Sequence, residues 1–282
     1  MPNVFFPRPS TTQGRRFNRR TVLTLLAATP VILSSAARAQ QSRPIRVGIL
    51  SGEDEDIWHI VQENARTAGL AIEAIPFSEG TPINAALVAG DLDANAFQHG
   101  PYLQAQNTAL GAHIVPVGNT YFAPVGFYSK KWTSLSALPQ GATIGVPADP
   151  TNEGRALKLL QSLGLLKIAT VPDGMPTALD IAENPKSLTI KELDDPVLAR
   201  SLPDLDAGVV ITEWAYKAGI DLNKERLARE SMENNPYINF IAVNENNAHA
   251  PWIQPLVKAF QQPNVREKLL EAYHGAIIPS WS

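Results

Sequence analysis

The stretch at 91–102, DLDANAFQHGPY, decides the fold of this chain. Residues 91–96 read as a short strand, and Pro101 is well placed to begin a helix. Between the strand and the first turn of the helix lie four side chains suited to ligand contact: Phe97, Gln98, His99 and Tyr102. Open α/β sheets bind ligands at such a place, where a strand ends and a helix begins. The alternative is that these are ordinary core aromatics and a loop histidine, so the interpretation depends on the rest of the chain.

Strand and helix patterns alternate along the body of the chain, from Ile45 onward. The predicted strands are 45–50, 113–117, 123–129, 142–146 and 237–243, with a turn at 118–120. Helical stripes of apolar residues lie at 57–68 and 156–163, and further helices are predicted at 81–89, 221–233, 250–260 and 265–273. This unbroken alternation predicts a mixed α/β fold.

The charge of the chain is unevenly distributed. Its 282 residues have a formal net charge of −3, but the first 39 residues carry six arginines and no acid, which leaves the remainder at about −9. A body this acidic is a poor partner for nucleic acid or an anionic membrane. The sequence has no cysteine, which excludes disulfides, thiolate metal sites, a cysteine nucleophile and a lipid-modified cysteine.

The segment 1–39 has the layout of a secretory signal peptide that is cut after its last residue. A basic patch at 15–20 precedes an apolar run at 22–33, and Ala37-Arg38-Ala39 supplies the small residues of a cleavage site. The apolar run is shorter than the roughly 20 residues needed to span a bilayer. Arg19-Arg20 further resembles a twin-arginine export signal. We expect export to a bacterial periplasm; the alternative is a cytosolic protein with a disordered basic tail.

A second candidate binding element lies at 149–155, DPTNEGR. Thr151 or Asn152 is a good N-cap for the helix that follows, so Arg155 falls in its first turn. Helix N–H groups and a guanidinium meet there, which is a geometry that binds carboxylate or phosphate. The alternative is that Arg155 is an exposed surface residue.

No motif for catalysis or metal binding is present. The five histidines lack the spacing of metal ligands, and the chain has neither a glycine-rich phosphate loop nor a GxSxG or HExxH pattern. The acidic pairs Asp54 with Asp56 and Asp194 with Asp195 read as solvated faces or helix starts. We therefore expect no enzyme, no metal and no cofactor.

Five long segments of the body carry a resemblance to a known family. They are DANAFQHGPYL at 93–103, VGNTYFAPVGFYSKK at 117–131, VPADPTNEGRAL at 146–157, ENPKSLTIKEL at 183–193 and NPYINFIAV at 235–243. Together, and in this order, they resemble the methionine-binding lipoprotein family (NlpA/MetQ-like). The resemblance implies a two-lobed α/β fold of the type II periplasmic-binding-protein kind, with two crossover strands and the ligand in the interlobe cleft. It implies lobe 1 at 44–122 and 238–282, and lobe 2 at 123–237.

The same resemblance implies which residues bind the ligand. Its aromatic, imidazole, amide and guanidinium contacts fall on Phe97, His99, Tyr102, Tyr121, Asn152 and Arg155. Two positions depart from the family pattern: a pocket tyrosine falls at Gly80, and a pocket asparagine falls at Ile211, or at Thr212 after a one-residue shift. Glu213 is a substitute partner for an ammonium group, and the Trp214 ring can replace the aromatic contact that the pocket loses with the tyrosine.

The implied function is a periplasmic binding protein that delivers methionine, or a related amino acid, to the permease and ATPase of an inner-membrane ABC importer. The alternatives are a different ligand, such as a small peptide or a modified amino acid, and a subunit that presents its ligand to a membrane receptor. We expect a monomer. Because the family's lipid-bearing cysteine is absent, we also expect a freely diffusing protein without a lipid anchor.

Overall fold

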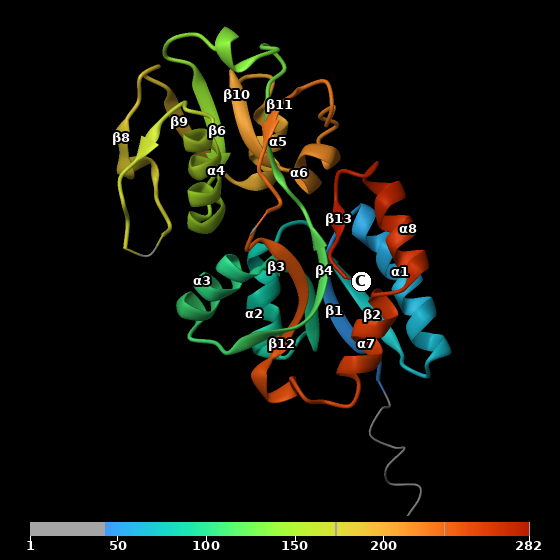
Figure 1. The fold of residues 1–282 in the computed structure, drawn as a ribbon. Coiled ribbons are helices and arrows are strands. Elements are labelled where there is room, and N and C mark those ends of the chain that lie inside the picture. Colours follow the sequence, from blue (N-terminus) through green and yellow to red (C-terminus); the bar gives the residue numbers. More distant parts are fainter. Residues whose placement is uncertain (1–42, 173, 234, 282) are drawn as a thin grey trace, which may run out of the picture. The chain divides into compact units, whose positions relative to one another are not determined.

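The computed structural model describes residues 43–172, 174–233 and 235–281, so the predicted signal peptide at 1–39 lies outside the described residues. The described chain forms two α/β lobes, each built on its own sheet (Figure 1). None of the described helices is both long and apolar enough to cross a membrane.

The sheet of lobe 1 has six strands in the order β13-β4-β12-β3-β1-β2. They are β1 (Ile45–Leu50), β2 (Ile72–Phe77), β3 (Ala94–His99), β4 (Ile114–Phe122), β12 (Ile238–Asn244) and β13 (Ile278–Pro279). β1 is parallel to β2 and β3, whereas β12 returns late in the chain and pairs antiparallel with β3 and β4.

Helices cover both faces of this sheet (Figure 1). One face carries α1 (Glu53–Thr67), α7 (Ile253–Phe260) and α8 (Pro263–Ala272), and the other carries α2 (Thr81–Ala89) and α3 (Gly100–Leu110). Because β1 and β3 are covered on both faces, their side chains are almost all buried, as in other doubly covered strands.

The sheet of lobe 2 has five strands in the order β11-β5-β10-β6-β9. They are β5 (Val125–Tyr128), β6 (Thr143–Pro147), β9 (Thr189–Leu193), β10 (Ala207–Ile211) and β11 (Arg226–Arg229). The helices of this lobe are α4 (Pro150–Ser162), α5 (Asp195–Ser201) and α6 (Thr212–Lys217). A small ribbon follows α4, formed by β7 (Lys167–Ile168) and β8 (Ile181–Glu183), and short 3₁₀ turns lie at Leu135–Ala137, Ala178–Asp180 and Glu245–Asn247.

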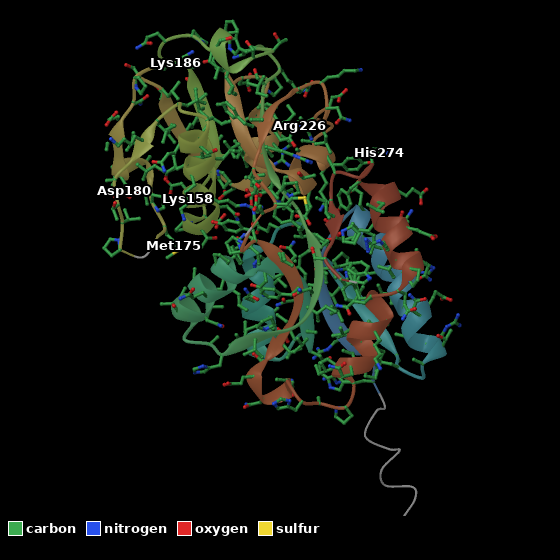
Figure 2. All side chains as sticks on the ribbon, in the orientation of Figure 1. Lys158, Met175, Asp180, Lys186, Arg226 and His274 are labelled. Carbon is green, nitrogen blue, oxygen red and sulfur yellow. The ribbon has the colours of Figure 1, made fainter. Side chains whose placement is uncertain are left out.

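The chain passes between the two sheets twice, from β4 to β5 and from β11 to β12. The predicted two-lobed α/β fold is therefore confirmed. The lobes also meet where the Tyr216 hydroxyl lies 3.5 Å from His274 Nε2, on the side where Figure 2 labels Arg226 and His274.

Three local predictions were wrong. The strand expected at 91–96 is β3, which begins at Ala94 and continues to His99 because its last residue pairs with Asn239 of β12. The turn expected at 118–120 lies inside β4, which is extended because β12 pairs along its length. The helix expected at 221–233 includes β11 instead, since its alternating residues pair with the edge strand β5.

A buried polar cluster fixes β3 against α2. Asn84, Asn95 and Gln98 are all buried, and their side-chain amides bond one another at 2.7–2.9 Å. A buried amide is tolerated only when its donors and acceptors are paired, so this cluster holds the strand and the helix in one register. It also fixes the end of β3 at His99, where α3 begins.

Candidate functional site

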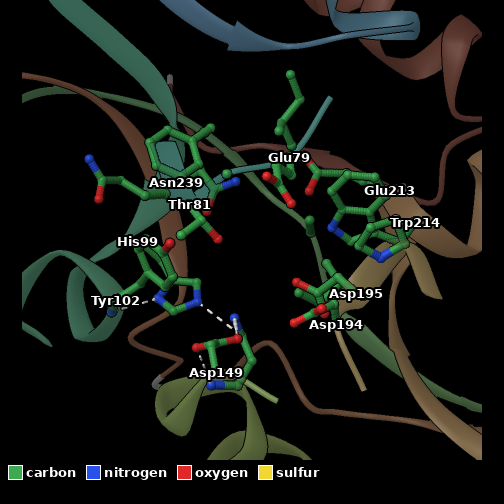
Figure 3. Close-up of a pocket in the computed structure, with 18 of the residues that line it drawn as sticks. Glu79, Thr81, His99, Tyr102, Asp149, Asp194, Asp195, Glu213, Trp214 and Asn239 are labelled. Carbon is green, nitrogen blue, oxygen red and sulfur yellow. Dashed lines mark hydrogen bonds between the residues drawn. The ribbon is translucent and has the colours of Figure 1, made fainter. Parts of the chain in front are cut away.

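A pocket of about 110 Å³ lies between the two lobes, and both contribute to its walls (Figure 3). Lobe 1 supplies residues at the ends of β1 and β3 and at the starts of β12, α2 and α3. Lobe 2 supplies residues at the end of β10 and at the starts of α4, α5 and α6. In Figure 3, His99 and Tyr102 stand across the pocket from Asp194, Asp195 and Trp214.

The structure brings nine of the ten predicted site residues into this lining. They are Gly80, Phe97, His99, Tyr102, Asn152, Arg155, Ile211, Glu213 and Trp214. Tyr121 is not among the lining residues: it is buried near the end of β4, and its hydroxyl donates a 2.5 Å hydrogen bond to Glu213 Oε1. It therefore acts on the pocket wall through Glu213.

His99 connects the two lobes. It is the N-cap of α3, where its Nδ1 accepts a hydrogen bond from the Tyr102 backbone N–H at 3.2 Å. A neutral imidazole that accepts at Nδ1 carries its proton on Nε2, and Nε2 lies 3.1 Å from Asn152 Oδ1. Burial, reinforced by the positive charge of Arg155, lowers the pKa of His99 to about 3, so the ring stays neutral and donates to Asn152.

Asn152 is held in turn by the N-cap of α4. The cap is Asp149, rather than the expected Thr151 or Asn152: its Oδ1 accepts from the Asn152 N–H and its Oδ2 from Asn152 Nδ2. Asn152 thus positions His99 from the pocket lining, and the second N–H of its Nδ2 has no hydrogen-bond partner among the described residues.

Arg155 is deeply buried, at 3% exposure, and so the alternative of a surface arginine is wrong. Its Nε and Nη2 form an ion pair with Glu230, and Nη2 also donates to the Ala123 carbonyl at 2.8 Å. The guanidinium stacks over the Tyr237 ring, 4.2 Å from its centroid. Nη1 has only a 3.4 Å contact with Asn152 Oδ1, so it is the guanidinium nitrogen with the weakest hydrogen bonding to the described residues.

Glu213 belongs to a buried acidic network that reaches into lobe 1. Burial raises its pKa, and the nearby Asp54 has its pKa raised to about 7 by burial and by the charge of Glu213. Asp54 is 1% exposed and accepts a 3.2 Å hydrogen bond from the Tyr273 hydroxyl, so it begins α1 as predicted but not as a solvated residue.

The two departures from the family pattern have structural consequences. A Cβ built on Gly80 would lie 2.9 Å from Phe97 Cε2, so the Phe97 ring covers the space that a side chain there would use. Ile211 ends β10 with an apolar side chain in the lining, next to the carboxylate of Glu213 at the start of α6.

Several acidic and polar lining residues were not among the ligand contacts predicted from the sequence. They are Glu79, Asp149, Asp194, Asp195 and Asn239. Asp194 and Asp195 do begin α5, as expected of a helix start, but they also follow directly on β9, at the end of a parallel strand. That position was the available signal, because ligands gather at the carboxyl ends of such strands. No group of three or more His, Cys, Asp or Glu among the described residues could hold a metal ion.

Comparison with known proteins gives consistent matches. The NlpA lipoprotein family profile matches residues 45–281. The D-methionine-binding lipoprotein MetQ of Escherichia coli (strain K12) is 40% identical over 240 residues, which cover 84% of this chain and 88% of the relative. A nutrient-binding protein from Burkholderia cenocepacia, solved bound to methionine, is 45% identical with a TM-score of 0.81, covering 84% of this chain and all of that one. An ABC transporter periplasmic substrate-binding protein from Coxiella burnetii is 40% identical with a TM-score of 0.79 and the same coverage.

These matches overturn one prediction. We expected a freely diffusing protein without a lipid anchor, but the matched family is one of lipoproteins, which are lipid-anchored to the membrane, and its relatives are named lipoproteins. The expectation was wrong because it depended on the absence of one residue type, and composition is weak evidence against the anchoring of a whole family.

Proposed function

The chain belongs to the NlpA lipoprotein family, and from this premise we propose that it is the periplasmic substrate-binding protein of an ABC importer for methionine or a related amino acid. The observation that carries the proposal is the pocket between the lobes, where one buried guanidinium and several aromatic rings face a common space. An amino acid needs this combination, because its carboxylate and its side chain must be held at the same time. The relatives named above support it.

In the proposed complex, Arg155 Nη1 donates to the ligand carboxylate. Phe97, Tyr102 and Trp214 contact the side chain, while His99 and Asn152 keep the two lobes together around it. We assign lobe 1 to 44–122 and 238–282 and lobe 2 to 123–237, with closure by a hinge at the two crossovers. The ligand is released to a permease and its ATPase without chemical change, and the protein acts as a monomer.

Native mass spectrometry of the purified protein, followed by thermal-shift measurements with L- and D-methionine, tests the proposal. A ligand at about 100 times its dissociation constant adds roughly 2.7 kcal/mol of stability, which is a readily measured shift. An adduct or a shift supports the binding role. The absence of both, with methionine and with related amino acids, contradicts it.

A matched pair of tryptophan variants locates the binding. Trp214 lines the pocket, whereas Trp252 is half-buried in lobe 1 and is not a lining residue. We expect methionine to change the fluorescence of the wild type and of Trp252→Phe, and to change that of Trp214→Phe far less. If methionine changes the fluorescence of Trp214→Phe as much as that of the wild type, the ligand binds at another site.

A further inference from the structure

The pocket is unusually acidic for a neutral amino acid. Among the described residues that line it, five are carboxylates and Arg155 is the one lysine or arginine. The carboxylates are Glu79, Asp149, Asp194, Asp195 and Glu213. Arg155 already forms an ion pair with Glu230, which is outside the lining. Its positive charge therefore does not neutralise the carboxylates of the pocket wall.

Three of the five carboxylates need no ligand. Asp149 is fully engaged as the cap of α4, with both oxygens accepting hydrogen bonds. Glu79 and Asp194 are exposed, so water and salt screen their charges. The remaining two, Asp195 and Glu213, are the ones that a ligand must satisfy.

Neither remaining carboxylate forms an ion pair with a described lysine or arginine, because Arg155 pairs with Glu230 and Lys217 lies over Trp214. Asp195 Oδ1 is shielded from solvent and has no hydrogen-bond partner among the described residues. Glu213 is 4% exposed, and only its Oε1 accepts a hydrogen bond, from Tyr121. A carboxylate that is shielded from water is costly to charge, so burial raises the pKa of both groups, and the charges of Asp149 and Glu213 raise that of Asp195 further.

The described lysines and arginines do not supply a direct partner for Asp195 or Glu213. Lys217, on the same helix as Glu213, acts on its charge from a distance, but its ammonium lies over the Trp214 ring, 4.9 Å from the centroid. Arg155 reaches both carboxylates only through space. On the other side of Glu213, Glu53 and Asp54 add further negative charge.

The ammonium of an α-amino acid carries one positive charge, whereas the wall of lobe 2 presents two carboxylates that form no ion pair with the described lysine and arginine side chains. We infer that the ligand is an amino acid whose side chain carries a second positive charge, held by Asp195 and Glu213 beside the Trp214 indole. The inference rests on the proposed function and narrows its substrate class. The Trp214 ring would further favour a cationic side chain, because cations are attracted to the face of an indole.

Calorimetric titration of the full chain, freed of co-purified ligand by unfolding and refolding, tests this with three probes. S-methylmethionine differs from methionine by one methyl group and one positive charge. Ethionine has the same number of heavy atoms as S-methylmethionine but no added charge. At neutral pH we expect S-methylmethionine to bind at least roughly tenfold more tightly than ethionine, since a partly buried ion pair is worth about that much.

Charge-removing variants identify the partners. Asp195→Asn and Glu213→Gln keep the side-chain shape and should each reduce the preference for S-methylmethionine over ethionine by roughly tenfold. Asp204→Asn, an exposed residue of the same lobe outside the lining, should leave it unchanged. Circular dichroism verifies that each variant is folded.

The outcomes separate the two proposals. If methionine or ethionine binds and S-methylmethionine binds no better, the second-charge inference is overturned and the proposed function stands. If the preference exists but survives in both pocket variants, Asp195 and Glu213 are not its source and the inference is overturned as well. If none of the three probes binds, the proposed function and the inference fail together.

Discussion

Arg155, in the second turn of α4 rather than the expected first, forms an ion pair with Glu230, which lies in the segment that follows β11. The side chains are 2% and 11% exposed, so the pair is shielded from water. Glu230 also accepts a 2.8 Å hydrogen bond from the Val125 N–H, at the start of β5. The residue that is proposed to bind the ligand carboxylate is thus also part of the structure that holds the first crossover and lobe 2 together.

Arg155→Ala should therefore lose both binding and stability. Removing one partner of a buried ion pair leaves the other charged and unpaired, which typically costs about 3–5 kcal/mol. We expect a loss of this size in urea unfolding, together with loss of methionine binding. Arg200→Ala, an exposed arginine on α5, is the control and should change neither. A stability equal to that of the wild type would mean that the ion pair contributes nothing.

A double variant separates the two effects of Arg155. In Arg155→Ala with Glu230→Gln, no charge is left unpaired, so stability should recover by about 1–3 kcal/mol relative to Arg155→Ala alone. Ligand binding should not recover, because Nη1 is still missing. Recovery of binding would show that Arg155 serves only to neutralise Glu230.

The neutral state of His99 predicts a pH dependence. Its pKa is about 3 in the folded protein and 6.5 in the unfolded chain, so below pH 6.5 the unfolded chain binds the extra proton. The contribution of His99 to stability is complete above pH 6.5 and is lost as the pH falls toward 3, at about 1.4 kcal/mol per pH unit. The free energy of unfolding, measured in urea between pH 4.5 and 7.5, should lose this dependence on pH in His99→Gln. The same dependence should remain in His59→Gln, because His59 is an exposed histidine on α1.

Asp54 predicts a pH dependence of stability with the opposite sign. Its pKa is raised from 3.8 to about 7. Between these two pH values the folded protein binds one more proton than the unfolded chain, so it loses stability as the pH rises from 3.8 to about 7. Asp54→Asn keeps an acceptor for the Tyr273 hydroxyl and cannot ionise. We expect it to exceed the wild type in stability at pH 8 by about 1–3 kcal/mol, with the gain vanishing near pH 4. The exposed Asp56→Asn should give no such gain, and a gain independent of pH would contradict the assignment.

The contrast between Arg155 and Asp195 explains how much the sequence could predict. Local patterns placed His99 at the end of a strand and Arg155 near the start of a helix, because strand ends and helix starts are encoded within a few neighbouring residues. They also suggested Asn152 as a helix cap, a position that Asp149 takes instead. The partner of Arg155 is 75 residues away, and the orientation of Tyr121 depends on which face of β4 it occupies. Asp195 reads as a helix start from sequence alone, and only the packing of α5 against the pocket turns it inward.

Gly80 tests whether Phe97 has taken over the space of the family's tyrosine. The backbone of Gly80 is helical, with φ −79°, so a side chain brings no backbone strain there. The Cβ of alanine would nevertheless lie 2.9 Å from the edge of the Phe97 ring, which must shift. Because that ring is buried, we expect Gly80→Ala to cost about 1–2 kcal/mol and to weaken methionine binding.

The double variant Gly80→Ala with Phe97→Leu removes the contact and should restore much of the lost stability. Phe97→Leu alone should weaken binding, since its ring lines the pocket. Thermal unfolding and calorimetry of the three variants measure both effects. If Gly80→Ala binds and unfolds like the wild type, Phe97 moves freely and the glycine is not required by the ring. A gain in affinity with Gly80→Tyr would go further, because it would show that this pocket still accepts the family's aromatic wall.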